Sequence, residues 1–218
     1  MQMAEKLPLI GLIELGFELC GTYSLPTVAD PLPPEIGFNN RTQLTNTRRL
    51  ERIAANMVGS HGRKKALRAL RYITDGSASP METKLTILLI LPYMLGGYGL
   101  QKPIANYRII PVKSVKKSSS KGSYVSDLFW PDYNLAVEYD SDQYHTNLSQ
   151  IAEDSKKRNA LNLMGITVVT VTKQQLYSSI ELEKVARILA KHLEKRLQFR
   201  NPDYARIRGN LRRQLFDS

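Results

Sequence analysis

The alternation of apolar and polar residues along the chain predicts both helices and strands. Residues 85–91 are apolar on nearly every side of a helix, which is typical of a buried helix. Ser79, Pro80 and Glu82 occupy the cap, first and third positions of that helix, and together they indicate a strong helix start. Residues 107–113 contain isoleucine and valine and predict a strand.

The second half of the chain extends this pattern. Residues 123–140 predict two strands joined by a tight turn, and residues 148–164 predict a helix closed by Gly165. Residues 166–172 are almost continuously β-branched, which predicts a strand buried on both faces. The resulting order, helix–strand–strand–strand–helix–strand–helix, predicts an α/β fold with a mixed central sheet and helices on its faces.

The N-terminal part of the chain predicts a small, mainly helical region. Helices are expected over residues 45–57 and 61–72, after a proline-rich loop over residues 24–40. This region is either a flap on the main domain or an incomplete accessory domain. The expected boundaries are 1–76 for this region, 77–199 for the main domain with a last helix over 178–199, and 200–218 for a basic C-terminal tail.

The amino-acid composition indicates what kind of partner the protein binds. The 218 residues include 31 Lys and Arg against 20 Asp and Glu, which gives a formal net charge of +11. Such an excess predicts a polyanionic partner, either nucleic acid or an anionic membrane surface. No apolar run is long enough to cross a bilayer, so we expect no membrane association. The single cysteine, Cys20, fits a reducing cytoplasm.

Two basic segments are candidates for contact with nucleic acid. One is the helix expected over 61–72, and the other is the polar loop that follows residue 113. A solvated helix face is an equally good interpretation of the first segment. The candidate nucleic-acid-binding residues are Arg63, Lys64, Lys65, Arg68, Lys116, Lys117 and Lys121.

The expected hairpin over 123–140 carries three acids. If its turn is centred on residues 132 and 133, Asp127 falls directly opposite Glu138, with Cβ atoms about 5 Å apart. Asp140 projects on the same side as Glu138 because strand side chains alternate. Like charges in facing positions are destabilising, and a divalent cation held by carboxylate oxygens would offset the repulsion. Asp127, Glu138 and Asp140 are therefore the candidate metal ligands.

These residues also carry a family resemblance. The segment SDLFWPDYNLAVEYDSDQYH, followed by DSKKRNALNLMGITVVTVT, resembles the PD-(D/E)xK nuclease superfamily, in its branch related to the very-short-patch-repair endonucleases. That branch combines an Asp-containing strand, an (I/V)E-x-D strand, a nearby Gln or His, and an Asp-x-x-x-Arg helix. The resemblance covers residues 79–177 and implies a restriction-endonuclease-like αβββαβ core.

The resemblance implies a DNA endonuclease that uses Mg²⁺ or Mn²⁺ and acts in repair, restriction or defence. Asp127 and Glu138 would be metal ligands, and Glu82 would match the acid of the first helix, although a helix cap alone would also explain Glu82. Gln143 or His145 would orient the attacking water. RNA as the substrate and a homodimer or protein partner stay open.

The chain departs from the superfamily's wider motif at Asp140, which stands where many members have a lysine. An Asp supplies no positive charge, so a second cation, or Lys156 or Lys157 from the next helix, would have to supply it. The missing lysine also supports an alternative function. The domain would then be a catalytically weak or inactive nucleic-acid-binding or regulatory module, for example in a toxin–antitoxin or defence system.

Overall fold

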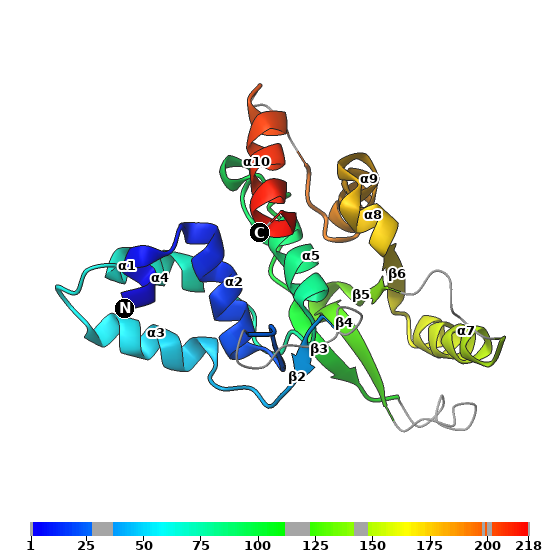
Figure 1. Cartoon of the computed structure of the whole chain (residues 1–218). Coiled ribbons are helices and arrows are strands. Elements are labelled where there is room, and N and C mark those ends of the chain that lie inside the picture. Colours follow the sequence, from blue (N-terminus) through cyan, green and yellow to red (C-terminus); the bar gives the residue numbers. More distant parts are fainter. Residues whose placement is uncertain are drawn as a thin grey trace. The chain divides into compact units, whose positions relative to one another are not determined.

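A computed structural model of the chain describes residues 2–27, 37–111, 123–141, 148–197, 199 and 202–217. The chain divides into two compact units (Figure 1). Unit 1 contains Met1–Lys102 together with Gln198–Ser218, and unit 2 contains Pro103–Leu197. Each unit has helices and strands of its own.

Unit 2 is built on a mixed four-stranded sheet in the order β3-β4-β5-β6. Its strands are β3 (Ile104–Ile109), β4 (Tyr124–Trp130), β5 (Leu135–Asp140) and β6 (Thr167–Thr172). The first three strands pair antiparallel, and β6 pairs parallel with β5 after the crossover helix α7 (Leu148–Leu163). The expected α/β fold with a mixed sheet flanked by helices is confirmed.

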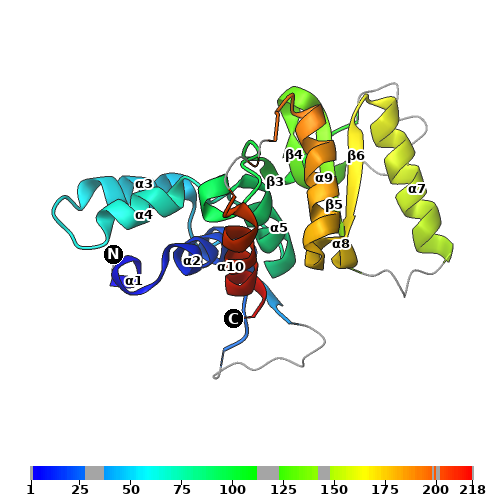
Figure 2. The ribbon, with the colours of Figure 1, turned by 90° about the horizontal axis from the view of Figure 1, so that it is seen from above.

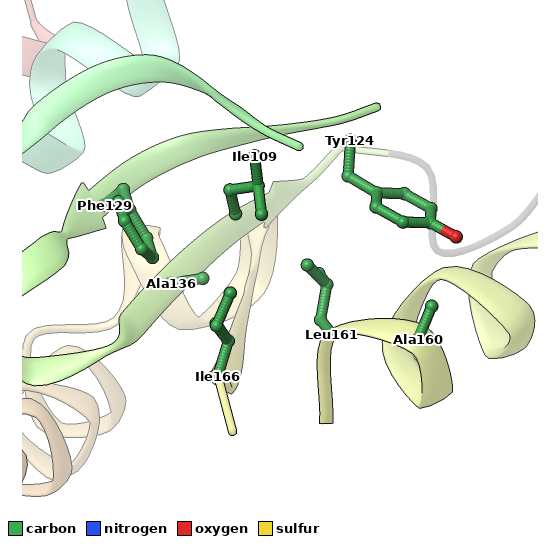
Figure 3. Close-up of a cluster of buried hydrophobic side chains, with 7 residues drawn as sticks. All are labelled: Ile109, Tyr124, Phe129, Ala136, Ala160, Leu161 and Ile166. Atoms are coloured by element: carbon green, nitrogen blue, oxygen red, sulfur yellow. The ribbon is translucent and has the colours of Figure 1, made fainter. Parts of the chain in front are cut away.

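Apolar side chains from the sheet and α7 form a core cluster in unit 2 (Figure 3). Leu161 of α7 and Ala136 of β5 are fully buried within it. The cluster members are Ile109, Tyr124, Phe129, Ala136, Ala160, Leu161 and Ile166. Gly165 follows α7 with φ 72, so it ends the helix in the left-handed conformation that favours glycine.

Two expectations for unit 2 are wrong in detail. Strand β6 is mostly half-buried rather than buried on both faces, because it lies at an edge of the sheet. The last helix is also shorter than expected. A short helix, α8 (Lys173–Tyr177), precedes α9 (Ser179–His192), and Glu194 then takes a positive φ of 52 that breaks the helical path. Helices α7 and α9 lie on different sides of β6 (Figure 2).

Unit 1 is mainly helical, as expected from its sequence. Its elements are α1 (Gln2–Lys6), α2 (Leu9–Cys20), β1 (Tyr23–Ser24), β2 (Asn39–Asn40), α3 (Thr47–Asn56), α4 (Arg63–Leu70), α5 (Pro80–Ile90), the 3₁₀ turn η1 (Tyr93–Leu95) and α10 (Tyr204–Phe216). Helix α5 begins as expected, because the Ser79 hydroxyl accepts the Glu82 N–H and Pro80 occupies the first turn. Since α5 packs against α2, the boundary expected after residue 76 falls inside unit 1.

The segment expected to be a basic tail is an ordered part of unit 1. Tyr204, Leu211 and Leu215 of α10 are buried, and the Tyr204 hydroxyl donates to the Gly97 carbonyl oxygen at 3.0 Å. Gly97 has no room for a side chain, because a Cβ there would lie 2.1 Å from the Leu91 carbonyl oxygen. The glycine-rich run after α5 is therefore a tight structural loop that receives α10.

Among the described residues, no helix is both long and apolar enough to cross a membrane.

Candidate functional site

The turn between β4 and β5 sets the alignment of the acidic residues. Residues Pro131–Tyr133 form a 3₁₀ turn, and Asn134 follows with φ 46. The strands leave this four-residue turn in the expected register, with the pairs Leu128 and Val137, Phe129 and Ala136, and Trp130 and Leu135. The register, continued by one step, brings Asp127 to Glu138.

The regular ladder is interrupted at Asp127. Its carboxylate Oδ2 accepts the backbone N–H of Tyr139 at 2.6 Å. On the other side of β4, the pairs Ala105–Leu128 and Tyr107–Ser126 leave Asn106 opposite Asp127. Asn106 has φ 47, a left-handed conformation that is uncommon for residues other than glycine and that asparagine tolerates best. The sheet is thus distorted at the level of the first acid.

Glu138 is paired with a lysine from α7. Lys157 Nζ donates to Glu138 Oε2 at 2.7 Å and to the Val125 carbonyl oxygen at 2.9 Å. The two side chains are only 28% and 22% exposed. Lys157 therefore joins β4, β5 and α7, and it places one positive charge directly on the second acid.

Burial dominates the titration of both acids. It raises the pKa of Glu138 to about 7, although Lys157 opposes the shift, and the neighbouring charge of Asp127 adds to it. Burial also raises the pKa of Asp127, against the hydrogen bond from Tyr139 and the charge of Lys157. The charge of one lysine therefore does not offset the effect of burial on the pKa of either acid.

One oxygen of Glu138 has no well-formed hydrogen bond among the described residues. Glu138 Oε1 is buried, and the nearby Ser126 hydroxyl, which lowers the pKa of Glu138, donates to the Leu128 and Val137 carbonyl oxygens. Buried polar atoms are normally satisfied, so this oxygen has the capacity to accept a further ligand. The structure does not supply a third ligand in the way the sequence suggested. Among the described residues, no group of three or more His, Cys, Asp or Glu side chains could hold a metal ion, so Asp140 does not complete a three-carboxylate set.

Glu82 belongs to unit 1, where local contacts account for its position. It is 9% exposed, and its Oε2 accepts the backbone N–H of Ala78 at 3.0 Å. This contact, with the Ser79 cap, makes Glu82 part of the start of α5. Its expected catalytic role stays a prediction.

Several other candidates lie outside the described residues, namely Gln143, His145, Lys116, Lys117 and Lys121. The four basic residues of α4 are described and differ from one another. Lys64 and Arg68 are exposed, whereas the side chains of Arg63 and Lys65 donate to backbone carbonyl groups within unit 1.

The sequence named Lys156 and Lys157 as equal sources of positive charge, and the structure distinguishes them. Lys156 is exposed, whereas Lys157 reaches Glu138. A signal for this choice is present in the sequence. Lys157 stands three and four residues before Ala160 and Leu161, which both face the core, so helical spacing directs it to the sheet. The roles of the Tyr139 N–H and of Asn106 have no comparable sequence signal.

Comparisons with known proteins give two weak matches. Both are uncharacterized proteins of Mycobacterium tuberculosis, MT2308 from strain CDC 1551 / Oshkosh and Rv2248 from strain ATCC 25618 / H37Rv. Each is 24% identical over 146 residues, which cover 67% of this chain and 48% of the relative. The chain thus spans about half the length of these relatives. No protein-family model and no solved structure matches the chain.

Proposed function

We propose that unit 2 is the catalytic core of a metal-dependent DNA endonuclease, in which Asp127 and Glu138 bind Mg²⁺ or Mn²⁺. The observation that carries the proposal is the buried Oε1 of Glu138, which has no well-formed hydrogen bond among the described residues, beside the half-buried carboxylate of Asp127. A protein that needed these acids only for structure would be expected to satisfy both oxygens or to use apolar residues.

The residues present fit a hard divalent cation. Mg²⁺ is commonly bound through one or two carboxylates, with waters and substrate phosphates completing the coordination. Two acids are therefore sufficient, and the absence of a three-residue group among the described side chains is compatible with such a site. When bound, the metal would lower the pKa of a water and stabilise negative charge on the phosphate.

Lys157 has the position for the charge that the missing motif lysine would supply. Its ammonium group donates hydrogen bonds to Glu138 and to the Val125 carbonyl oxygen, and these two bonds hold it beside the acids in one conformation. A fixed cation at this point favours the extra negative charge of a phosphate under attack. Its charge also lowers the pKa of Glu138 against the effect of burial, which favours the carboxylate form that coordinates a metal.

Backbone strain at the same level adds support. Residues in sparsely populated backbone conformations concentrate at functional sites, and Asn106 lies in register with Asp127. At the same level, the Asp127 carboxylate accepts the Tyr139 N–H.

A second candidate function is a nuclease-like module that binds nucleic acid without cutting it. The observation in its favour is the Lys157–Glu138 ion pair, which already neutralises one acid. On this hypothesis the pair is purely structural, and no metal is needed.

The test is a supercoiled-plasmid nicking assay with Mg²⁺, Mn²⁺ or EDTA. We expect metal-dependent nicking by the wild type and background activity for Asp127→Asn and Glu138→Gln. Asp132→Asn is the matched control, because it removes an exposed acid from the turn of the same hairpin. A parallel RNA substrate distinguishes the two nucleic acids.

Lys157→Met should lower the nicking rate by about 100-fold, the usual effect of removing one fixed charge from such a site. Lys156→Met is its control and should retain activity. Wild-type protein that never nicks with metal would favour the binding module, and nicking that survives both acid substitutions would refute the assigned site.

A further inference from the structure

The α3–α4 hairpin of unit 1 has one apolar face that points inward. Both helices line an apolar cavity of about 230 Å³. The lining residues from these two helices are Leu50, Ile53, Ala54, Ala66, Ala69 and Leu70. Since side chains on the opposite side of each helix point away from this cavity, the two helices present a second, outward face.

The outward face of α4 is a stripe of cations. Lys64 and Arg68 of α4 and Arg71 at its C-cap are separated by four and three residues, so they lie on one side of the helix, and all three are exposed. Among the described residues, none of the three forms an ion pair, and the sequence from 61 to 72 contains no Asp or Glu. No acid in the described part of unit 1 therefore forms an ion pair with them.

The other two cations of α4 have a structural role. Arg63 Nε donates to the Ala54 carbonyl oxygen at 3.0 Å, near the end of α3. Lys65 Nζ donates to the carbonyl oxygens of Leu7 and Glu5 at 2.9 Å and 3.2 Å, at the C-terminal end of α1. Cations at helix C-termini satisfy free carbonyl groups and stabilise the helix dipole. Arg63 and Lys65 therefore anchor α4 within unit 1, whereas Lys64 and Arg68 are exposed on its outward face.

We propose that Lys64, Arg68 and Arg71 form a docking surface for the phosphodiester backbone of duplex DNA. Arg48 and Arg52 extend it, because they are exposed, four residues apart, and opposite the cavity-lining side of α3. The surface belongs to unit 1, whereas the acidic pair belongs to unit 2. The proposal rests on the proposed function for the choice of substrate, and it assigns substrate binding to residues that take no part in metal binding.

The dimensions of the stripe suit this partner. Helical residues rise 1.5 Å each, so the stripe from Lys64 to Arg71 is about 10 Å long. Duplex DNA carries one negative charge per about 1.7 Å of its axis, so a stripe of this length faces several phosphates. Such contacts carry no sequence information and are sensitive to salt.

An anionic membrane is the competing polyanion, and the structure favours nucleic acid. A helix that lies on a bilayer must insert an apolar face into it. The apolar face of α4 is occupied inside unit 1, where Ala69 and Leu70 are only 1% and 5% exposed. The helix therefore offers charge alone.

The test measures DNA binding in EDTA, so that no cleavage occurs. A fluorescein-labelled duplex of about 30 base pairs is titrated with wild type and with Lys64→Gln/Arg68→Gln/Arg71→Gln, over about 50 to 200 mM salt. The variant should bind about 10- to 100-fold more weakly, and the slope of log affinity against log salt should become shallower by about 2 to 3. Far-UV circular dichroism checks that the variant is folded.

The control is Lys184→Gln/Arg187→Gln/Lys191→Gln on α9. It removes the same number of exposed cations from one helix face, but Lys184 and Arg187 are already paired with Glu181 and Glu183. The control should retain the wild-type salt slope. An unchanged slope in the α4 variant, an equal loss in both variants, or stripe-dependent binding to anionic vesicles but not to DNA would each overturn the proposal.

These outcomes are separate from those of the nicking assay. If metal-dependent nicking is absent while the stripe still binds DNA, the proposed function fails and the docking surface stands. If nicking occurs but substitution of the stripe does not change DNA binding, the docking surface fails and the proposed function stands.

Discussion

The contact between Lys157 and Glu138 makes a strong prediction about stability. Replacing Lys157 with Met keeps the length and apolar character of the side chain but leaves the Glu138 carboxylate without its cation. Exposed ion pairs contribute up to about 1 kcal/mol, and breaking a fully buried pair costs about 3–5 kcal/mol. The side chains here are 28% and 22% exposed, so we expect Lys157→Met to destabilise unit 2 by about 2 kcal/mol.

The penalty should depend on pH in a defined direction. Burial raises the pKa of Glu138 from an ordinary 4.5 to about 7, so the folded state favours the protonated carboxyl group. The stability that this group contributes is fully present below about pH 4.5 and is lost as the pH rises through about 7. Lys157 lowers this pKa, so replacing Lys157 raises the pKa of Glu138 further. The loss of stability caused by ionisation of Glu138 then continues to a higher pH. Lys157→Met should therefore be costly at about pH 8.5 and nearly neutral at about pH 5.

Urea denaturation followed by tryptophan fluorescence measures this effect. Trp130 is the only tryptophan in the chain and is buried at the end of β4, so its emission reports unit 2. The double-mutant cycle of Lys157→Met and Glu138→Gln should give a coupling free energy of about 1 kcal/mol at the higher pH. Lys156→Met should be neutral. A coupling near zero, or an equal penalty at both pH values, would refute the reasoning.

Two further predictions concern unit 1. Burial raises the pKa of Glu14 to about 7 against the opposing charge of Lys84, so its ionisation destabilises the folded state as the pH rises from about 4.5 to 7. Glu14→Gln should therefore stabilise the protein by about 1–2 kcal/mol at about pH 8.5 and give no gain at about pH 4.5, as measured by circular dichroism in urea, and an equal effect at both pH values would contradict it. Gly97→Ala should destabilise unit 1 by more than about 2 kcal/mol, because its Cβ would meet the Leu91 carbonyl oxygen at 2.1 Å. Gly209→Ala on α10 has free space around its Cβ and should be neutral or slightly stabilising, so equal melting temperatures for the two variants would count against this account.

The parts of the structure that could be predicted are those fixed by local chemistry. The start of α5 follows from Ser79 and Pro80, and the hairpin register follows from an even-length turn at residues 131–134. Both features depend on a few neighbouring residues, so no distant contact can change them easily. The same register predicts that Asp127 and Glu138 lie close together, and the charge of Asp127 does act on the pKa of Glu138.

The parts that could not be predicted depend on which elements, distant in the sequence, pack against one another. The apolar character of α5 shows that it is buried, but not that it packs against α2. A boundary predicted after residue 76 therefore falls inside unit 1. Strand β6 reads as doubly buried because β-branched residues suit any strand, including one at an edge. The sequence predicts a basic tail over residues 204–216, because the arginines between Tyr204, Leu211 and Leu215 hide the apolar spacing of the helix.

The return of α10 to unit 1 has a consequence for the order in which the protein assembles. The hydrogen bond from Tyr204 to Gly97 closes a loop of more than one hundred residues that contains all of unit 2. During synthesis unit 2 can fold as soon as its own residues emerge, since domains generally fold as units, whereas unit 1 must wait for residues 204–216. Residues 1–102 are therefore made before unit 2 but completed after it, and the slow step of unit 1 is long-range closure rather than formation of its helices.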